Sequence, residues 1–306
     1  MVRVGVPDAD LLAALAPLPD GVEALVWDPA RDDPPAEALD IVVLPYLRGT
    51  DDGLATAAPT ARRLVQSQML GYDGVADRLP PGVTFANARG VHEASTAELA
   101  VGLILASLRR LPALLNGAGP AAPAYPAGRS LADRRVLVLG QGGVGAAIVD
   151  RLLPFDVDLV RLARSERRDD RGAVHGMAEL PSLLPTADVV VLAVPLDDTT
   201  RHLVDADFLS RLRRGALLVN VSRGAVVDTA ALAAAARDGL VDAALDVTDP
   251  EPLPAGHELL GLPNVLITPH IGGNSSAMLP RIARLVRTQA ERIRDGLEPV
   301  NVVLRT

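Results

Sequence analysis

Hydrophobic and polar residues alternate at the start of the chain in the way that half-buried strands require. Apolar side chains recur at Val2, Val4 and Val6, and Asp8 is placed to cap a short helix that runs to Leu15. Three more short apolar runs are expected to be strands, at residues 22–27, 41–44 and 64–67. Strands separated by short helices or loops predict a small α/β layer over residues 1–94.

Longer apolar runs follow in the second half of the chain. Residues 136–139 form a continuous apolar run between charge and glycine, which is typical of a buried strand in a parallel sheet. Further strands are expected at 157–162, 188–194, 216–221, 241–247 and 265–268, with helices between them such as 208–212 and 229–237. This alternation predicts a doubly wound parallel sheet of Rossmann type.

Helix signals also mark the connection between the two layers. Ser95-Thr-Ala-Glu98 matches a capping box, so we expect Ser95 to cap an apolar helix over residues 99–111. Pro112 would stop that helix. Residues 111–128 are uncharged and rich in Pro and Gly, which predicts an extended arm.

The end of the chain is expected to return to the first layer. Apolar residues at helical spacing predict a helix over 275–294, and residues 300–304 resemble a final strand. We therefore place one domain at residues 1–94 plus 276–306, and a second domain at residues 95–275.

Composition removes several classes of chemistry. The 306 residues contain no cysteine, and because there is no lysine all 30 basic residues are arginine. Disulfides, thiolate metal sites, Schiff-base catalysis and the P-loop lysine are thereby excluded. A net charge of −8 argues against a nucleic-acid surface, and the longest apolar run, 99–108, is too short to span a membrane. The N-terminus enters a strand without a signal peptide, so we expect a cytoplasmic enzyme or binding protein.

A glycine-rich loop follows the strand at 136–139. Gly140, Gly142 and Gly145 have the G-x-G-x-x-G spacing and lead into an Ala-rich helix. Such glycines allow a tight turn, close approach of a pyrophosphate and helix–strand packing, with the phosphates at the helix N-terminus. Because glycines between a strand and a helix can also form an ordinary turn, the motif alone is weak.

Three different functional groups follow later strands of the same sheet. Arg223 can bind a carboxylate through two hydrogen bonds, His270 can exchange protons near neutral pH, and Glu251 can hold a protonated imidazole. Taken singly, each is as well explained as a solvated rim arginine, a loop histidine or a surface-turn glutamate. Their occurrence on one nucleotide-binding sheet favours an active site.

Several motifs resemble the D-isomer-specific 2-hydroxyacid dehydrogenase family, in particular its glyoxylate/hydroxypyruvate reductases. They are the Gly140 loop, Val219-Asn-Val-Ser-Arg-Gly224, Asp249-Pro-Glu-Pro252 and Thr268-Pro-His-Ile-Gly-Gly273. The resemblance is strong over residues 129–273 and looser over 1–94, where Gly71-Tyr-Asp73 and Asn87-Ala-Arg-Gly90 are similar to the family's substrate loop and hinge. It implies a smaller, flavodoxin-like substrate domain beside the cofactor domain, a cleft between them, and a homodimer.

The resemblance also implies a role for each matching residue. Arg223 would bind the substrate carboxylate and keto oxygen, His270 would be the acid/base and Glu251 its partner. The backbone N–H groups of Leu70 and Gly71 would bind the substrate carboxylate, and Asp246 the nicotinamide carboxamide. The residues that we expect to contact the cofactor are Gly140, Gly142, Gly143, Val144, Gly145, Arg164, Ser165, Val194, Pro195, Thr200, Val221, Asp246 and Gly272.

The end of the second strand of the predicted Rossmann-type sheet, at residues 157–162, bears on the choice of cofactor. The family places an aspartate there to bind the adenosine ribose, whereas this chain has Ala163 followed by Arg164 and Ser165, with Arg167 and Arg168 close behind. Loss of the carboxylate and gain of arginines predict NADP(H) as the preferred cofactor, with NAD(H) possible. The alternative is that these arginines face solvent.

The sequence thus predicts hydride transfer between NADP(H) and a small 2-keto or 2-hydroxy acid. Phosphoglycerate dehydrogenase is an alternative, and so is a non-catalytic cofactor-sensing protein like the corepressors that resemble this family. Arg48 could meet a second anionic group of a substrate, although a solvated loop arginine fits as well. The remaining histidines have no metal-ligand spacing, so no metal site is expected: His92, His175, His202 and His257.

Overall fold

A computed structural model describes residues 1–46, 53–117 and 128–306. The chain divides into two compact units, each described by itself below. Unit 1 consists of Met1–His92 and Ser275–Thr306, and unit 2 of Glu93–Asn274. Their limits fall at 92/93 and 274/275, against 94/95 and 275/276 expected from the sequence.

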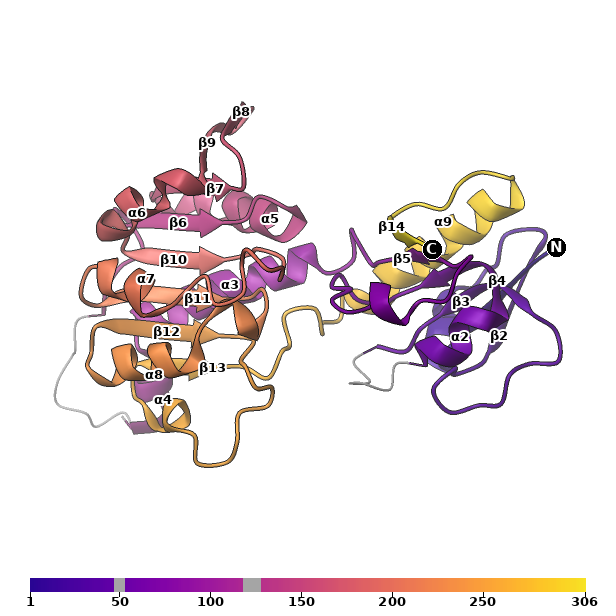
Figure 1. Ribbon diagram of the computed structural model, residues 1–306, viewed down its shortest axis with the longest axis horizontal. Coiled ribbons are helices and arrows are strands. Elements are labelled where there is room, and N and C mark those ends of the chain that lie inside the picture. Colours follow the sequence, from indigo (N-terminus) through magenta and orange to yellow (C-terminus); the bar gives the residue numbers. More distant parts are fainter. Residues whose placement is uncertain (47–52, 118–127) are drawn as a thin grey trace. The chain divides into compact units, whose positions relative to one another are not determined.

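Unit 1 is built on a six-stranded sheet (Figure 1). Its strand order is β14-β5-β4-β3-β1-β2, and only β14 is antiparallel, on β5. The order of the first five strands is that of flavodoxin-like folds, and β14 confirms that the end of the chain returns to the first layer. The strands are β1 (Val2–Val6), β2 (Val22–Val26), β3 (Leu39–Val43), β4 (Ala61–Gln66), β5 (Thr84–Ala86) and β14 (Val302–Arg305).

Helices cover both faces of this sheet. α1 (Ala9–Ala14) and α9 (Met278–Arg294) pack on one face, and α2 (Leu54–Thr60) packs on the other with Trp27. Asp8 caps α1 as expected, its carboxylate accepting the N–H of Leu11 at 2.8 Å. The last helix begins at Met278, three residues later than the sequence suggested.

Unit 2 contains the predicted doubly wound sheet. Its order is β13-β12-β11-β10-β6-β7-β9-β8, which contains the Rossmann order and is parallel except at β8. The strands are β6 (Arg135–Leu139), β7 (Asp158–Ala163), β8 (Arg167–Asp169), β9 (Gly172–Gly176), β10 (Val189–Leu192), β11 (Ala216–Asn220), β12 (Val241–Leu245) and β13 (Val265–Ile267).

Two apolar layers sandwich this sheet, which explains why its strands are apolar on both faces. α3 (Glu93–Leu108) and α5 (Gly143–Leu152) cover one face. α6 (Leu180–Leu183), α7 (Ala206–Arg211) and α8 (Thr229–Arg237) cover the other, as Figure 1 shows. Single-turn 3₁₀ helices complete the chain: η1 (Ala76–Arg78), η2 (Leu153–Phe155), η3 (Met177–Glu179), η4 (Leu184–Thr186), η5 (Gly224–Val226) and η6 (Glu258–Gly261).

The connection after unit 1 corrects two expectations. α3 begins at Glu93, so Ser95 is buried inside the helix and does not cap it, while Glu98 forms an ion pair with Arg151 at 3.3 Å. A second helix, α4 (Leu111–Gly117), occupies the start of the supposed extended arm. Pro112 is accommodated because the first turn of a helix needs no N–H from it. The rest of the arm, 118–127, lies outside the described residues.

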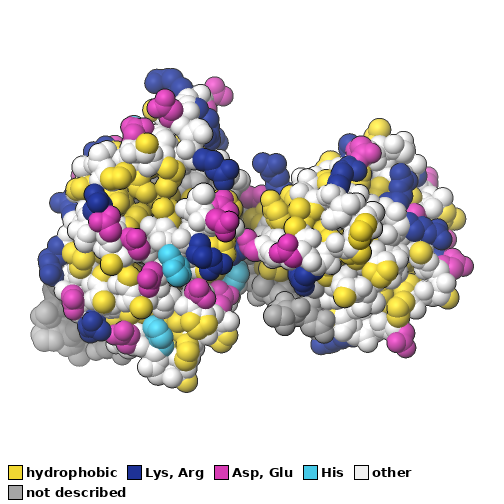
Figure 2. Space-filling model, in the orientation of Figure 1, with side chains coloured by type: hydrophobic (Ala, Val, Ile, Leu, Met, Phe, Trp, Pro, Cys, Tyr) yellow, Lys and Arg dark blue, Asp and Glu magenta, His cyan; other side chains and the backbone are white. Residues whose placement is uncertain are grey.

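The surface bears on the ligands that the protein can meet. In Figure 2, arginine and acidic side chains are interspersed over the visible face of each unit, without a broad basic stripe. Within the described part of the chain, no helix combines the length and the apolarity that crossing a bilayer requires.

Candidate active site

The glycine loop has the tight geometry that its sequence predicted. Gly140 has φ +98°, and a Cβ there would overlap the carbonyl oxygen of Ala193. A Cβ on Gly145 would overlap the carbonyl of Gly140, so β6 and α5 approach too closely for any other residue. Gly142 differs, because nothing lies within 4 Å of the position its Cβ would take.

This loop fits the pyrophosphate of a dinucleotide. Gly142 is the N-cap of α5 and offers no side chain to the helix, so the first-turn N–H groups of Gly143, Val144 and Gly145 are left for a ligand. The open space beside Gly142 lets a phosphate approach the backbone, and the helix dipole favours its negative charge. A nicotinamide dinucleotide therefore suits this edge of the sheet.

Asn220, at the end of β11, organises the loop that carries Arg223. Its amide donates to the carbonyl of Arg223 at 2.9 Å, and its side-chain oxygen accepts the N–H and the hydroxyl of Ser222 at 3.0 and 2.7 Å. Asn220 is only 1% exposed, so these bonds form away from competing water. We did not single out Asn220 from the sequence, where the only signal is a polar residue ending an apolar strand.

The Arg223 loop packs directly on the loop that contains Glu251. A Cβ on Gly224 would overlap the carbonyl oxygen of Thr248, so glycine is required at the crossing. The guanidinium of Arg223 bonds back to the carbonyl of Ser222 at 2.7 Å, and its charge acts on the Glu251 carboxylate. The two loops thus bring one cation and one anion together at the carboxyl ends of β11 and β12.

Asp246 fastens the loop that follows β13. Its carboxylate accepts the Thr268 hydroxyl at 2.7 Å and the N–H groups of Ile271 and Gly272, both at 2.9 Å. Gly272 must be glycine, since a Cβ would lie 2.9 Å from that carboxylate and 3.2 Å from Thr96. The Asp246 side chain is therefore largely satisfied within the protein, and the N–H of Gly272 is already used. Their expected cofactor contacts stay predictions.

His270 is held in an unusual backbone conformation beside Glu251. Its φ is +52°, and its N–H donates to the carbonyl of Asp246 at 2.8 Å. Nδ1 of His270 lies 2.6 Å from Oε1 of Glu251, and the imidazole is 32% exposed. With Nδ1 engaged, Nε2 is the ring atom left for proton exchange.

The electrostatics of Glu251 match this pairing. Partial burial acts to raise its pKa, but the hydrogen bond and charge of His270 lower it. The N–H of Thr248 and the charge of Arg223 lower it further, so the pKa of Glu251 lies below its usual 4.5. The carboxylate stays ionised and can stabilise an imidazolium.

The turn after β7, where we predict the ribose site, has no acid at position 163. Ala163 ends the strand, and Arg164, with a side chain 79% exposed, pairs with Asp197 at 3.0 Å. The hydroxyl of Thr200 donates to the carbonyl of Pro195 at 2.7 Å, which shapes the turn after β10. Arg167 and Arg168 lie on β8, in a hairpin that the sequence pattern did not reveal.

The pKa of Asp197 reflects its role in this turn. A hydrogen bond from the Thr199 hydroxyl lowers the pKa most strongly, and the Arg164 charge adds to the effect. Asp197 was not among the expected site residues, and it faces the guanidinium that would have to meet a 2′-phosphate.

The remaining expected residues are distributed over both units. Val194, Ser165 and Val221 lie in unit 2, within or beside the loops already described, whereas Leu70 and Gly71 belong to unit 1. Asn87 donates to the carbonyl of Leu70 at 2.8 Å, which fixes the loop after β4. Arg48 lies outside the described residues. His175 pairs with Glu179, and His257 caps η6.

Comparison with known proteins agrees with this arrangement. Residues 101–272 match the family model described as "D-isomer specific 2-hydroxyacid dehydrogenase, NAD binding domain". A glyoxylate reductase from Thermofilum pendens is 31% identical over 294 residues, covering 92% of this chain and 86% of its own. The chain belongs to the D-isomer-specific 2-hydroxyacid dehydrogenase family. It is accordingly an NAD(P)-dependent oxidoreductase, and the residues that match the NAD-binding model lie within unit 2.

Solved structures of relatives have the same fold. A family member from Aeromonas salmonicida superposes with a TM-score of 0.87 at 27% identity, covering 99% of both chains. An enzyme from Xanthobacter autotrophicus, in complex with NADPH, gives a TM-score of 0.80 at 28% identity and covers 99% of this chain and 98% of its own. The NADPH-dependent glyoxylate/hydroxypyruvate reductase of Sinorhizobium meliloti, with NADP and malonate, gives 0.78 at 29% identity, covering 99% and 96%.

Proposed function

We propose that this enzyme reduces a small 2-keto acid, of the glyoxylate or hydroxypyruvate type, with NADPH. The observation that carries the proposal is the pairing of His270 with Glu251 at 2.6 Å beside the Arg223 loop. That combination supplies a proton donor, a fixed counter-ion for it and a cation for an anionic substrate. The relatives named as glyoxylate reductases support the substrate class.

The residues divide the work of reduction. The bound nicotinamide supplies the hydride. Arg223 binds the substrate carboxylate and stabilises negative charge on the keto oxygen, while Nε2 of His270 gives that oxygen its proton. Glu251 holds the imidazole through Nδ1 and stabilises its charge, and Asn220 fixes the backbone from which Arg223 extends. The proposal also includes the backbone N–H groups of Leu70 and Gly71, in unit 1, as donors to the substrate carboxylate.

The preference for NADPH rests on the end of β7. No acid stands at position 163, and Arg164 and Ser165 offer a guanidinium and a hydroxyl to a 2′-phosphate. Relatives from Xanthobacter autotrophicus and Sinorhizobium meliloti are described with NADPH and NADP, which supports the same assignment.

A phosphorylated 2-hydroxy or 2-keto acid is the second candidate substrate. An erythronate-4-phosphate dehydrogenase from Salinibacter ruber is 39% identical over 236 residues, although the match covers only 55% of that protein.

The test measures NADPH consumption with glyoxylate, hydroxypyruvate, pyruvate and phosphohydroxypyruvate at matched concentrations. Turnover confined to the phosphorylated acid would replace the first proposal. No turnover with any of them, despite tight cofactor binding, would favour a cofactor-sensing protein.

A further inference from the structure

A basic cavity opens at the edge of the unit 2 sheet opposite the loops described above. It holds about 160 Å³ and is lined by the starts of β10 and β11, the segment before β6 and the end of α3. Ala216, which lines it, is four residues from Asn220 on β11, so the cavity lies about 13 Å along the strand from Asn220, at roughly 3.3 Å per residue. The lining residues are Leu108, Arg129, Arg134, Asp188, Arg213, Arg214, Gly215 and Ala216.

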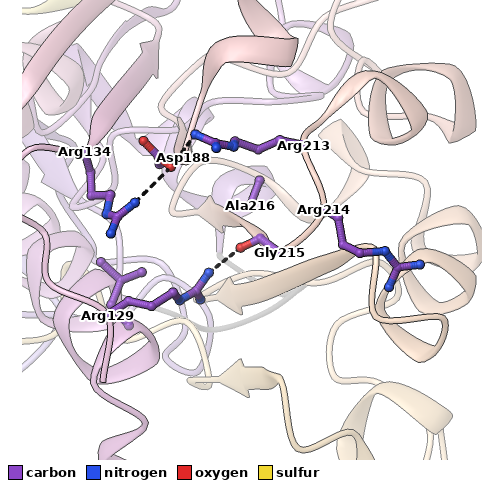
Figure 3. Close-up of a pocket in the computed structure, with 8 residues that line it drawn as sticks. Arg129, Arg134, Asp188, Arg213, Arg214, Gly215 and Ala216 are labelled. Atoms are coloured by element: carbon purple, nitrogen blue, oxygen red, sulfur yellow. Dashed lines mark hydrogen bonds and ion pairs between the residues drawn. The ribbon is translucent and has the colours of Figure 1, made fainter. Parts of the chain in front are cut away.

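Three guanidinium groups surround this cavity in Figure 3, and one carboxylate lies between two of them. The carboxylate of Asp188 accepts a hydrogen bond from Arg213 at 2.8 Å and lies 3.6 Å from the guanidinium of Arg134. One negative charge is thus shared between two positive charges. Arg129 is bonded to the carbonyl of Gly215 and paired with Asp242. The guanidinium of Arg214 points away from the centre in Figure 3 and donates to the carbonyls of residues 238 and 239.

The charge count leaves an excess that suits an anion. Three guanidinium groups face the cavity, whereas Asp188 and Asp242 are the carboxylates paired with them, so one positive charge is left over. Hydrogen-bond donors remain as well. Within residues 1–46, 53–117 and 128–306, no partner is assigned to Nε and Nη2 of Arg213, to Nη2 of Arg134 or to Nε of Arg129.

The cavity has room for a small anion. Its 160 Å³ of space for the centres of water-sized groups is many times the roughly 10–15 Å³ that a single water requires by the same measure. One tetrahedral oxyanion therefore fits. Guanidinium forks match phosphate oxygens in geometry as well as in charge.

We propose that the cavity formed by Arg129, Arg134 and Arg213 is a binding site for a phosphate group, separate from the cofactor and substrate sites. The phosphate can be free or carried by a small phosphomonoester. Because it would bind only the folded cofactor domain, its occupancy stabilises unit 2 by mass action. This inference does not depend on which keto acid the enzyme reduces.

The test is a calorimetric titration of the enzyme, saturated with NADPH, with inorganic phosphate at constant ionic strength. NADPH keeps phosphate from the N-terminus of α5. We expect binding by wild type, at least tenfold weaker binding by Arg213→Gln, and a smaller loss in Arg213→Lys, which keeps the charge without the fork. Arg171→Gln is the matched control, since Arg171 pairs with Asp150 at 2.6 Å and does not line the cavity.

A second readout keeps the proposal testable if Arg213→Gln folds poorly. Phosphate should raise the melting temperature of wild type and Arg171→Gln more than that of Arg134→Gln, with sodium chloride at equal ionic strength as the reference. Glycerol 3-phosphate, titrated in parallel, distinguishes the sources: tighter binding than inorganic phosphate indicates a phosphomonoester, and weaker binding indicates the free ion. Equal phosphate affinity in wild type and both cavity variants, or no binding by wild type, overturns the proposal.

Discussion

At the scale of single residues, the candidate site depends on buried polar groups that hold its loops in place. The carboxylate of Asp246 accepts hydrogen bonds from Thr268, Ile271 and Gly272, and so holds the loop that carries His270. Asn220 does the same for Arg223. Each is nearly inaccessible to water, where an unmade hydrogen bond costs most. The reactive side chains are half-exposed, and their supports are not.

Replacing His270 tests the assignment of the acid. His270→Asn should lower kcat for keto-acid reduction by about 10²- to 10⁴-fold, because proton transfer to the keto oxygen is lost. Asparagine tolerates the positive φ found there, so the loop should keep its shape. Cofactor affinity, followed by fluorescence, should stay near wild type. His202→Asn is the matched control, since His202 also has a positive φ, and retained turnover in His270→Asn would refute the assignment.

Replacing Glu251 tests its partnership with the imidazole. Reduction needs the protonated ring, and Glu251→Gln removes the charge that stabilises it. The upper limb of the kcat/KM profile for keto-acid reduction should therefore move to lower pH. Glu258→Gln, which removes an exposed ion pair with Arg237, should leave the profile in place. An unmoved limb in Glu251→Gln would mean that another group stabilises the imidazolium.

The lowered pKa of Glu251 has a consequence for stability. A carboxyl group whose pKa is lower in the folded than in the unfolded chain stabilises the fold at pH values above its unfolded pKa, near 4.5. That contribution is lost as pH falls through the lower, folded pKa. Urea unfolding should show a smaller loss of stability in Glu251→Gln than in wild type as the pH falls from about 5 through the folded pKa of Glu251. If the free energy of unfolding falls equally with pH in both proteins, this prediction is wrong.

At the scale of elements, the cofactor preference is a property of one strand end. Ala163→Asp with Arg164→Ala should shift the NADPH/NADH ratio of kcat/KM towards NADH by about tenfold or more, since a charged hydrogen bond contributes about 1.5–3 kcal/mol. The remaining Asp197 adds to the repulsion of a 2′-phosphate. Arg211→Ala, which breaks an exposed pair with Asp207, is the control. A wild-type preference for NADH would rule out this interpretation of the strand end.

How much the sequence predicts also differs between elements. Strands such as β6 and β11 were predictable because strands buried on both faces appear as continuous apolar runs, as at 136–139 and 216–221. The three-residue strand β5 of unit 1 was not predicted. The β8–β9 hairpin was not, because Arg167–Asp169 is exposed and carries no such run. The start of α3 was placed too late because Ser95 faces the interior, where a capping motif has no effect.

The site was predictable in part for a related reason. Motifs showed that Arg223, Glu251 and His270 follow strands of one sheet, and parallel strands bring such loops to the same edge. The supports could not be foreseen, because the bonds of Asn220 and Asp246 depend on where folding places distant loops. The basic cavity has no local motif either, since its arginines come from segments far apart in the chain.

At the scale of the whole molecule, we expect a homodimer. Leu111 and Leu115 of α4 are 43% and 82% exposed, which is costly on an isolated chain. Light scattering at micromolar concentration should give twice the chain mass of 31.9 kDa. Leu115→Arg should favour the monomer, whereas Leu153→Arg, at an exposed leucine of η2, should not. A wild-type mass of one chain would contradict the expectation.

The split composition of unit 1 sets the order in which the protein can be made. Its sheet includes β14, and its core includes Ile282, Val286 and Ile293 of α9, all of which are synthesised after unit 2. Unit 2 is continuous from Glu93 to Asn274, so it can fold before residues 275–306 have been synthesised. Residues 1–92 can therefore complete their sheet and core only after unit 2 has been made, and until then their apolar strands lack the cover of α9.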